Sequence, residues 1–136
     1  MSHENAEIVK ASIDGWNRRD FDAWMDSSHS HPEIEWSSEV TMRMEGSEAV
    51  FRGRDGLRKY WDEWHALWEV RIDPTEIRDL GDTVLVIAQT RTLVEVSGID
   101  IEGAVAYVFE FEGSLARRVR SYLDPRTALE AVGLSE

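Results

Sequence analysis

The fold is most tightly restricted by a run of strand-like segments in the second half of the chain. Four segments alternate in polarity and are rich in β-branched and aromatic residues, namely residues 70–80, 82–96, 99–111 and 114–124. The breaks between them carry residues that favour tight turns, at Gly81-Asp82, Ser97-Gly98 and Glu112-Gly113. Connections this short join antiparallel neighbours, so the pattern predicts an antiparallel meander.

The first half of the chain shows helical periodicity instead. Residues 4–17 place apolar side chains at the spacing of one helix face. Asp20 is positioned to cap a short second helix, and Asp55 to cap a third, longer one. Between these helices, residues 33–40 alternate as a strand does, and we expect residues 40–53 to form a loop.

Helices followed by a meander make an α+β fold. Three amphipathic N-terminal helices must cover one face of the sheet, and a strongly curved antiparallel sheet would wrap around them as a cone. A short C-terminal helix follows Pro125 and is capped by Asp124. We expect one domain, residues 1–136, which buries about two-thirds of the surface of the unfolded chain.

Charge and composition narrow the possible partners. The formal net charge is −12, from 27 acidic and 15 basic residues. Such a surface repels phosphate backbones and anionic lipids, so we expect neither nucleic acid nor a membrane as a partner. The chain has no cysteine and shows no secretory signal or apolar run of about 20 residues, so we expect a cytoplasmic protein. A small, mostly apolar molecule remains as a partner.

The chain has six tryptophans, more than its size requires for folding: Trp16, Trp24, Trp36, Trp61, Trp64 and Trp68. Any single one is most simply core filler, because aromatic stripes on helices usually pack inward. As a set they are hard to pack without leaving a concave space, which predicts an aromatic-lined pocket. The predicted pocket wall comprises Trp16, Trp24, Trp36, Tyr60, Trp61, Trp64, Gln89, Arg91, Tyr107 and Ser121.

Alternation within residues 82–96 assigns these side chains to two faces of the sheet. The face toward the pocket is predicted to carry Leu85, Ile87, Gln89, Arg91 and Leu93. The outer, convex face is predicted to carry Val84, Val86, Ala88, Thr90 and Thr92. An exposed apolar strip of this kind needs a cover, so we expect a homodimer through the convex face.

Histidines offer only weak signals of chemistry. His29 and His31, with Glu33 and Glu35 nearby, lie two residues apart in a loop, which is poor spacing for a metal site. His65 falls off the apolar stripe of its helix, so we expect it at the surface. We predict neither a metal ion nor a cofactor.

Five segments are informative when taken together, in this order: WNRRDFDAW, HPEIEW, FRGRDGL, FEFEGSL and YLDPRTALEAVGL. Along nearly the whole chain they resemble the SnoaL-like branch of the nuclear-transport-factor-2-like superfamily. The resemblance implies a cystatin-like α-β barrel, with the convex face of the sheet packed against a second subunit. Members of the superfamily include polyketide cyclases, steroid isomerases, epoxide hydrolases, dehydratases and non-catalytic binding or assembly modules, so function must be argued from the site.

The acidic residues that limonene epoxide hydrolases use are replaced in this chain. Ser121 stands where their final strand carries the aspartate that works on water, and SnoaL-type cyclases place an acid close to the same point. Arg91 matches the arginine of those hydrolases, and Leu93 replaces their second acid. A serine has no useful basicity near neutral pH without an adjacent base.

Comparison with ketosteroid isomerases gives a similar result. Trp36 stands at the position of their proton-shuttling aspartate, Ser12 at that of a tyrosine, and Tyr107 at that of a protonated acid. Tyr107 would still donate a hydrogen bond to an oxyanion, competing with a role as a cavity aromatic. Arg91 would orient a polar group of the substrate, or pair with an acidic side chain.

We therefore predict a SnoaL-like protein that binds a small, mostly apolar molecule without the usual catalytic acids. One alternative is a cofactor-independent enzyme of polyketide cyclase, isomerase or epoxide hydrolase type. Its acid would come from the 40–53 loop region, through Glu39, Glu45 or Glu48. The other alternative is a dimeric interaction module with a closed interior.

Overall fold

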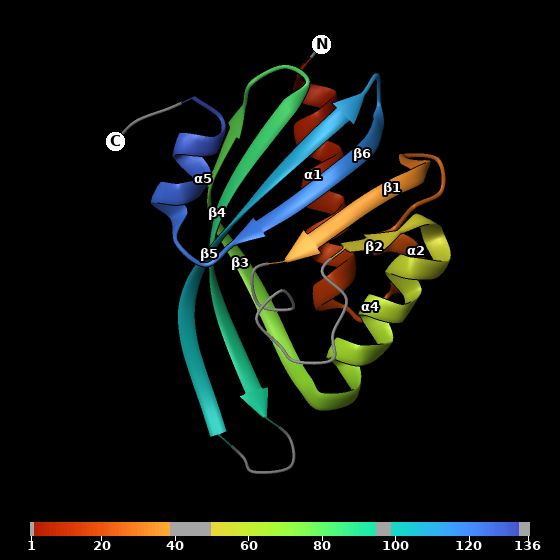
Figure 1. Ribbon diagram of the computed structural model, residues 1–136. Coiled ribbons are helices and arrows are strands. Elements are labelled where there is room, and N and C mark those ends of the chain that lie inside the picture. Colours follow the sequence, from red (N-terminus) through yellow and green to blue (C-terminus); the bar gives the residue numbers. More distant parts are fainter. Residues whose placement is uncertain (1, 39–49, 95–98, 134–136) are drawn as a thin grey trace.

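The computed structural model describes residues 2–38, 50–94 and 99–133 of the chain (Figure 1). The helices are α1 (Ser2–Asn17), α2 (Phe21–Trp24), α4 (Gly53–Leu67) and α5 (Pro125–Ala131). The strands are β1 (Ser30–Ser38), β2 (Val50–Arg52), β3 (Trp68–Asp79), β4 (Thr83–Val94), β5 (Ile99–Glu112) and β6 (Leu115–Tyr122). The predicted α+β class is confirmed.

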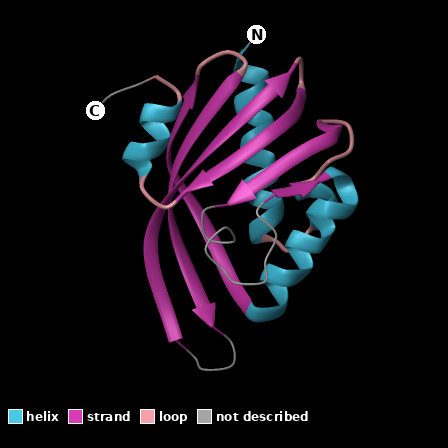
Figure 2. Cartoon of the chain, in the orientation of Figure 1, coloured by secondary structure: helices cyan, strands magenta, loops and turns pink. Residues whose placement is uncertain are grey.

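The strands form one curved, unclosed sheet in the order β2-β1-β6-β5-β4-β3 (Figure 2). Strands β3 to β6 are the predicted antiparallel meander. Strand β1 differs from the prediction because it pairs with β6 in parallel, Trp36 beside Val119. The three-residue strand β2 lies where a loop was expected and pairs with β1. It is too short for alternation to reveal it.

Helix ends follow elementary capping chemistry. The Asp20 carboxylate accepts a hydrogen bond from the Ala23 N–H at 3.2 Å, and Asp124 accepts one from the Arg126 N–H at 2.9 Å. Both caps were predicted. The prediction for the third helix was wrong, because α4 begins at Gly53 and Asp55 lies in its first turn.

Helices α1, α2 and α4 pack on the concave face of the sheet and α5 packs on the other face. Val84, Val86 and Ala88 are completely buried in the main core with the N-terminal helices, whereas Leu85 is buried in a second cluster with Leu129 of α5. Figure 1 shows α5 lying apart from the other helices.

The predicted faces of β4 are therefore reversed. The side chains at every second position from Val84 to Thr92 point to the concave side of the sheet. Gln89 and Arg91 are exposed on the other side. The odd-numbered and the even-numbered positions of β4 both begin with apolar residues, since Leu85 on the outer side is covered by α5. Polarity alone therefore did not identify the inner face of the strand. The strip from which a homodimer was predicted lies inside, and the dimer stays a prediction without that support.

Side chains of α1 complete the hydrogen bonding of the edge strand β3. The Asn17 amide donates to the Ile72 carbonyl at 2.7 Å and accepts from the Ile72 N–H at 2.8 Å. The Trp16 indole N–H donates to the Val70 carbonyl at 3.0 Å. These bonds cover edge groups that would otherwise pair with another strand, and they fix α1 against the sheet. Over the described residues, no helix is both long enough and apolar enough to cross a membrane.

Candidate functional site

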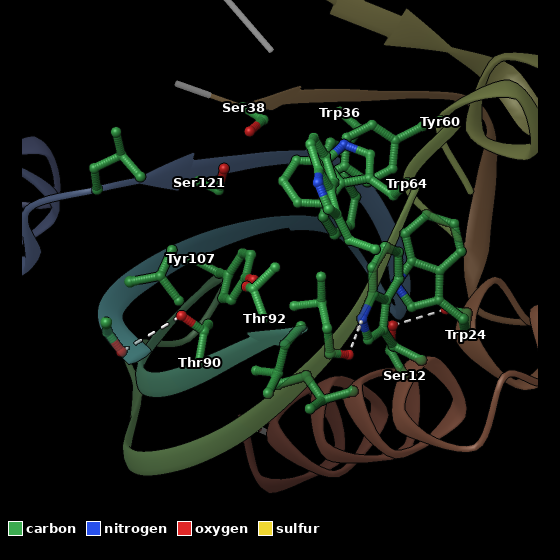
Figure 3. A pocket seen from close by; sticks show the side chains of 18 of the residues that line it. Ser12, Trp24, Trp36, Ser38, Tyr60, Trp64, Thr90, Thr92, Tyr107 and Ser121 are labelled. Carbon is green, nitrogen blue, oxygen red and sulfur yellow. Dashed lines mark hydrogen bonds between the residues drawn. The ribbon is translucent and has the colours of Figure 1, made fainter. Parts of the chain in front are cut away.

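A cavity of about 360 Å³ lies between the concave face of the sheet and helices α1, α2 and α4 (Figure 3). This volume falls within the range of small-molecule pockets. Its aromatic lining residues are Trp16, Trp24, Trp36, Tyr60, Trp64, Trp68, Tyr107 and Phe109. The other lining residues are Ser12, Ile13, Ser38, Val70, Ile72, Thr90, Thr92, Ile101, Gly103, Ala104, Val105, Ser121 and Leu123. No charged side chain is among these described residues.

The rim of the cavity is apolar and reaches solvent. Ile101 on β5 is 53% exposed and Leu123, just after β6, is 40% exposed, yet both line the cavity. The rim therefore gives a ligand an apolar route from solvent into the cavity.

The aromatic wall is one continuous network of rings. The ring centroids of Trp24 lie 5.2 Å from Trp16, 5.1 Å from Trp36 and 5.2 Å from Trp61. Tyr60 lies 5.4 Å from Trp36. Ring pairs at these separations and tilted angles attract one another, so the wall is held in shape by its own contacts.

Seven of the ten predicted wall residues line the cavity: Trp16, Trp24, Trp36, Tyr60, Trp64, Tyr107 and Ser121. Their predicted functions are a separate matter and stay predictions. Trp61 is buried but lies outside the lining, where it packs against Phe21 and His65. Gln89 and Arg91 were misplaced by the reversal of the β4 faces. The Arg91 guanidinium instead pairs with the Asp100 carboxylate at 2.6 Å on the solvent side.

Several lining residues were missed from the sequence. Thr90 and Thr92 were assigned to the convex face, and the reversal brings both into the cavity. Alternation along β1 puts Ser38 on the same side as Trp36, so the sequence carried a signal for it. Gly103 is the cross-strand neighbour of Thr90 and carries no side chain that would have marked it.

Polar groups at one end of the cavity form a cluster that we call the polar pole: Trp36, Ser38, Tyr60, Tyr107 and Ser121. Ser38 of β1 is opposite Ser121 of β6, which is opposite Tyr107 of β5, so the three share one row across the sheet. Tyr60 reaches the same end from α4, and Figure 3 shows Ser38 and Ser121 facing the same space. The polar pole carries hydroxyl and indole groups only.

Both phenols of the polar pole stay protonated at neutral pH. Burial raises the pKa of Tyr107 well above its ordinary value, and the neighbouring Tyr60 adds to this shift. Burial likewise raises the pKa of Tyr60, against smaller opposing effects of the Trp36 and Ser38 side chains. Tyr60 and Tyr107 therefore act as hydrogen-bond donors or acceptors, and neither is a base.

Outside the polar pole, the polar groups of Ser12, Thr90 and Trp16 bond to the protein itself. The Ser12 hydroxyl donates to the Trp24 carbonyl at 2.7 Å, and the Thr90 hydroxyl to the Gly103 carbonyl at 3.4 Å. The Trp16 indole N–H donates to the Val70 carbonyl. A molecule there meets chiefly apolar and aromatic surface.

His65 departs from its predicted place at the surface. Its ring lies 4.5 Å from that of Trp16 and 4.1 Å from that of Trp61, and both ring nitrogens are buried without a hydrogen-bond partner in the described part of the chain. Burial chiefly, with the positive charge of Arg19, lowers the pKa of His65 to about 4, and Asp62 opposes this. His65 is therefore neutral near pH 7 and lies behind the cavity wall.

The alternative sources of chemistry contribute nothing to the described lining. Nδ1 of His31 accepts a hydrogen bond from the Glu33 N–H at 2.9 Å. No group of three or more metal-ligating side chains occurs in residues 2–38, 50–94 and 99–133. Glu39, Glu45 and Glu48, from which a catalytic acid was considered, lie outside the described residues.

Solved structures with the same fold are numerous. An NTF2-like protein of unknown function from Burkholderia pseudomallei K96243 matches with 21% identity and a TM-score of 0.80, over 98% of this chain and 99% of that one. TerC co-crystallised with polyporic acid matches with 22% identity and a TM-score of 0.79, over 93% and 96%. A hypothetical protein with a ketosteroid isomerase-like fold from Catenulispora acidiphila, in complex with trimethylamine, matches with 17% identity and a TM-score of 0.73, over 94% and 93%.

At these identities the structures establish the fold and leave the activity open. No curated protein matches the chain. The model of the SnoaL-like domain family matches residues 9–119, which include α2, α4 and β1 to β5 entirely. This chain therefore belongs to the SnoaL-like domain family.

Proposed function

We propose that this protein binds a small, mostly apolar molecule in the aromatic-lined cavity. The observation that carries the proposal is a cavity of about 360 Å³ whose described lining is aromatic, aliphatic or hydroxylic and includes no charged side chain. Removing apolar ligand surface from water is the main driving force available in such a site. TerC and the Catenulispora acidiphila protein, each solved with an organic molecule, make ligand binding a reasonable expectation for the fold.

The described lining supports binding better than proton transfer. A general base needs a group that is unprotonated near neutral pH and within reach of the substrate. Tyr60 and Tyr107 hold their protons because burial raises the pKa of each phenol. Ser38 and Ser121 have no adjacent base among the described lining residues.

A second candidate is a cofactor-independent enzyme of cyclase, isomerase or hydrolase type. The buried Tyr107 phenol favours it, because a protonated donor in an apolar cavity stabilises a developing oxyanion. Its acid would come from Glu39, Glu45 or Glu48. If such turnover is found, Tyr107→Phe is expected to lower it by about tenfold or more, and unchanged turnover would remove the oxyanion role.

A cavity-blocking variant tests the binding proposal. Gly103 lines the cavity, and a Cβ atom there would meet only the Thr90 hydroxyl at 3.8 Å, an ordinary contact. Gly103→Leu therefore fills the cavity without a backbone clash. Glu102→Leu is the matched control, because Glu102 is exposed and pairs across the sheet with Arg91 on the outer side.

The measurement is tryptophan fluorescence titrated with a panel of steroids, polyketide intermediates and terpenoids. We expect a saturable change for at least one compound class in the wild type and in Glu102→Leu, and its loss in Gly103→Leu. A flat response to every class in the wild type contradicts ligand binding and favours the closed interaction module. Equal binding by Gly103→Leu places the ligand elsewhere.

We also propose, on the family resemblance alone, that the protein is a homodimer through the convex face of the sheet. The apolar strip first assigned to that face lies in the core, and Gln89 and Arg91 are exposed there instead. Light scattering after size-exclusion chromatography measures the mass directly. A monomer at about 100 μM, well above typical dissociation constants of stable dimers, contradicts the dimer.

A further inference from the structure

The electrostatic character of the cavity comes from aromatic rings and neutral dipoles. Eight aromatic side chains line it, and no Asp, Glu, Lys, Arg or His is among the lining residues that the structure describes. An aromatic ring has a negative face and a positive edge, so a wall of rings has an electric field even without formal charges. Ring faces attract positive charge. The cavity wall therefore distinguishes a cation from an anion.

Hydrogen bonds within the protein occupy the positive N–H groups of two lining indoles. The Trp16 N–H donates to the Val70 carbonyl at 3.0 Å. Burial raises the pKa of Tyr60, and a hydrogen bond from the Trp36 side chain opposes this shift, which directs the Trp36 N–H at the Tyr60 phenol oxygen. With these donors occupied, Trp16 and Trp36 offer a ligand chiefly the surface of their rings.

Four of the lining rings form a set that we call the aromatic cage: Trp36, Tyr60, Trp64 and Tyr107. Trp36 and Tyr107 belong to the sheet, whereas Tyr60 and Trp64 belong to α4, so the set borders the cavity from two sides (Figure 3). Ring centroids lie 5.4 Å apart for Trp36 and Tyr60, and 5.6 Å apart for Tyr60 and Trp64. Those of Trp36 and Tyr107 lie 6.2 Å apart. The planes of these pairs are inclined by 43°, 38° and 54°. A ligand group beside the aromatic cage thus meets rings of the helix and of the sheet together.

A quaternary ammonium group suits this wall better than other charged groups do. A carboxylate would lose its hydration without meeting a cation in the described lining. A primary ammonium carries three N–H donors and is strongly hydrated, and the described lining has no carboxylate to replace its water. A quaternary ammonium has no N–H to satisfy. Its methyl groups are apolar, so it gains from leaving water and from contact with ring faces at once.

We propose, resting on the binding function above, that the ligand is a small organic cation with an apolar body and a quaternary ammonium or similarly weakly hydrated positive centre. The positive centre lies against the aromatic cage, and the apolar body occupies the rest of the cavity. The hydroxyls of Ser121 and Tyr107 are neutral, so their oxygen lone pairs turn toward the cation. The net charge of −12 raises the concentration of cations around the protein.

Four probes of nearly one shape test the proposal: phenyltrimethylammonium, its uncharged isostere tert-butylbenzene, 2-phenylpropan-2-ylammonium and 2-methyl-2-phenylpropanoate. Dissociation constants come from calorimetry at about 0.3 M NaCl, where salt screens the acidic surface. We expect phenyltrimethylammonium to bind about fivefold or more tightly than tert-butylbenzene, within the range of cation–π contacts at desolvated sites. The primary ammonium should bind less tightly than the quaternary one, and the carboxylate least tightly.

Fluorinated tryptophan isolates the contribution of the rings, because fluorine withdraws charge from a ring face while the side chain keeps its shape. In protein grown with trifluorotryptophan, the affinity for phenyltrimethylammonium should fall about threefold or more, whereas that for tert-butylbenzene should stay within about twofold. Protein grown with monofluorotryptophan reports each tryptophan by fluorine NMR. Phenyltrimethylammonium should move the resonances of Trp36 and Trp64 more than that of Trp61, which lies outside the cavity lining.

Trp64→Leu removes one ring of the aromatic cage and keeps an apolar side chain. It should weaken phenyltrimethylammonium about threefold or more beyond its effect on tert-butylbenzene. Ile101→Ala is the control, because it removes apolar lining without removing a ring, and it should weaken the two probes to the same extent. If Trp64→Leu fails to fold, the fluorinated proteins still decide the proposal.

The outcomes separate this inference from the binding function. Equal binding of phenyltrimethylammonium and tert-butylbenzene, or an equal loss of both on fluorination, overturns the cation site and leaves the apolar pocket standing. Tightest binding by the primary ammonium or by the carboxylate overturns the assignment of a weakly hydrated cation. Binding of none of the four probes also overturns it, and the fluorescence panel described above then decides the binding function.

Discussion

Placing a carboxylate at residue 121 tests the neutrality of the polar pole directly. Ser121 is 8% exposed, and the described cavity lining offers no cation to pair with an acid. In Ser121→Asp, burial should raise the pKa of the new carboxyl above its unfolded value of about 3.9, so the folded state binds more protons than the unfolded state. The free energy of unfolding should therefore fall as the pH rises from about 4 to 7, by about 1.4 kcal/mol for each unit of pKa difference.

Urea unfolding at several pH values measures this slope. Ser37→Asp is the matched control, because Ser37 is only partly buried on the other side of β1, opposite Arg120. The control should show little loss of stability at pH 7. A Ser121→Asp protein that is as stable at pH 7 as at pH 4 would mean that a cation reaches the polar pole, and the binding proposal would lose the uncharged lining on which it depends.

His65 gives a pH dependence of the opposite sign, because burial lowers the pKa of this basic group. Its folded pKa of about 4 lies below the ordinary value of 6.5, chiefly through burial. Between these values the unfolded state binds more protons, so stability falls as the pH drops from about 6.5 to 4. His65→Phe should flatten the difference in urea-derived stability over this range relative to the wild type. An unchanged slope would show that the imidazole is already solvated in the folded protein.

At the scale of elements, the sequence predicted the helix caps and the meander, but it did not predict which face of β4 points inward. Caps at Asp20 and Asp124 and the meander followed from residue types and spacing, because these signals depend on near neighbours. The inner face of β4 depends on what covers each side. Leu85 and Val84 are both completely buried, under α5 and under the N-terminal helices respectively, so the pattern of β4 did not distinguish its faces. The cavity residues Thr90 and Thr92 were lost with that choice.

The junction between α1 and α2 offers an element-scale prediction. A Cβ atom on Gly15 would lie 2.4 Å from the Trp24 backbone nitrogen, and backbone has no flexible end that can move aside. Gly15→Ala should thus push the two helices apart and lower stability by about 1–3 kcal/mol, more than the roughly 1 kcal/mol that alanine gains in helix propensity. Because Trp16 and Trp24 belong to the cavity wall, probe binding should weaken too.

Gly103→Ala is the control for this change, since its Cβ meets nothing closer than 3.8 Å. Urea unfolding of both variants provides the comparison. If Gly15→Ala is as stable as Gly103→Ala, then α1 and α2 are free to separate, and the rigid aromatic wall on which the pocket argument depends is not maintained by their contact.

At the scale of the whole molecule, the net charge of −12 acts on any charged ligand before it reaches the cavity. The field of the protein repels an anion, attracts a cation and leaves an uncharged molecule unaffected, and salt screens each of these effects over about 10 Å at 0.1 M. The affinity for an uncharged ligand should therefore be constant from about 10 mM to 0.3 M NaCl, whereas any affinity for a cationic analogue should fall and any affinity for an anionic analogue should rise.

Calorimetric titrations at three salt concentrations measure this dependence, with sucrose at matched osmolality as the control for water activity. A neutral probe whose dissociation constant changes more than about threefold, beyond what salting-out of an apolar solute produces, contradicts a site without charge. The test also separates two levels of selection. Loss of discrimination among the probes at high salt would place selectivity in the acidic surface. Discrimination that persists at high salt locates it in the cavity.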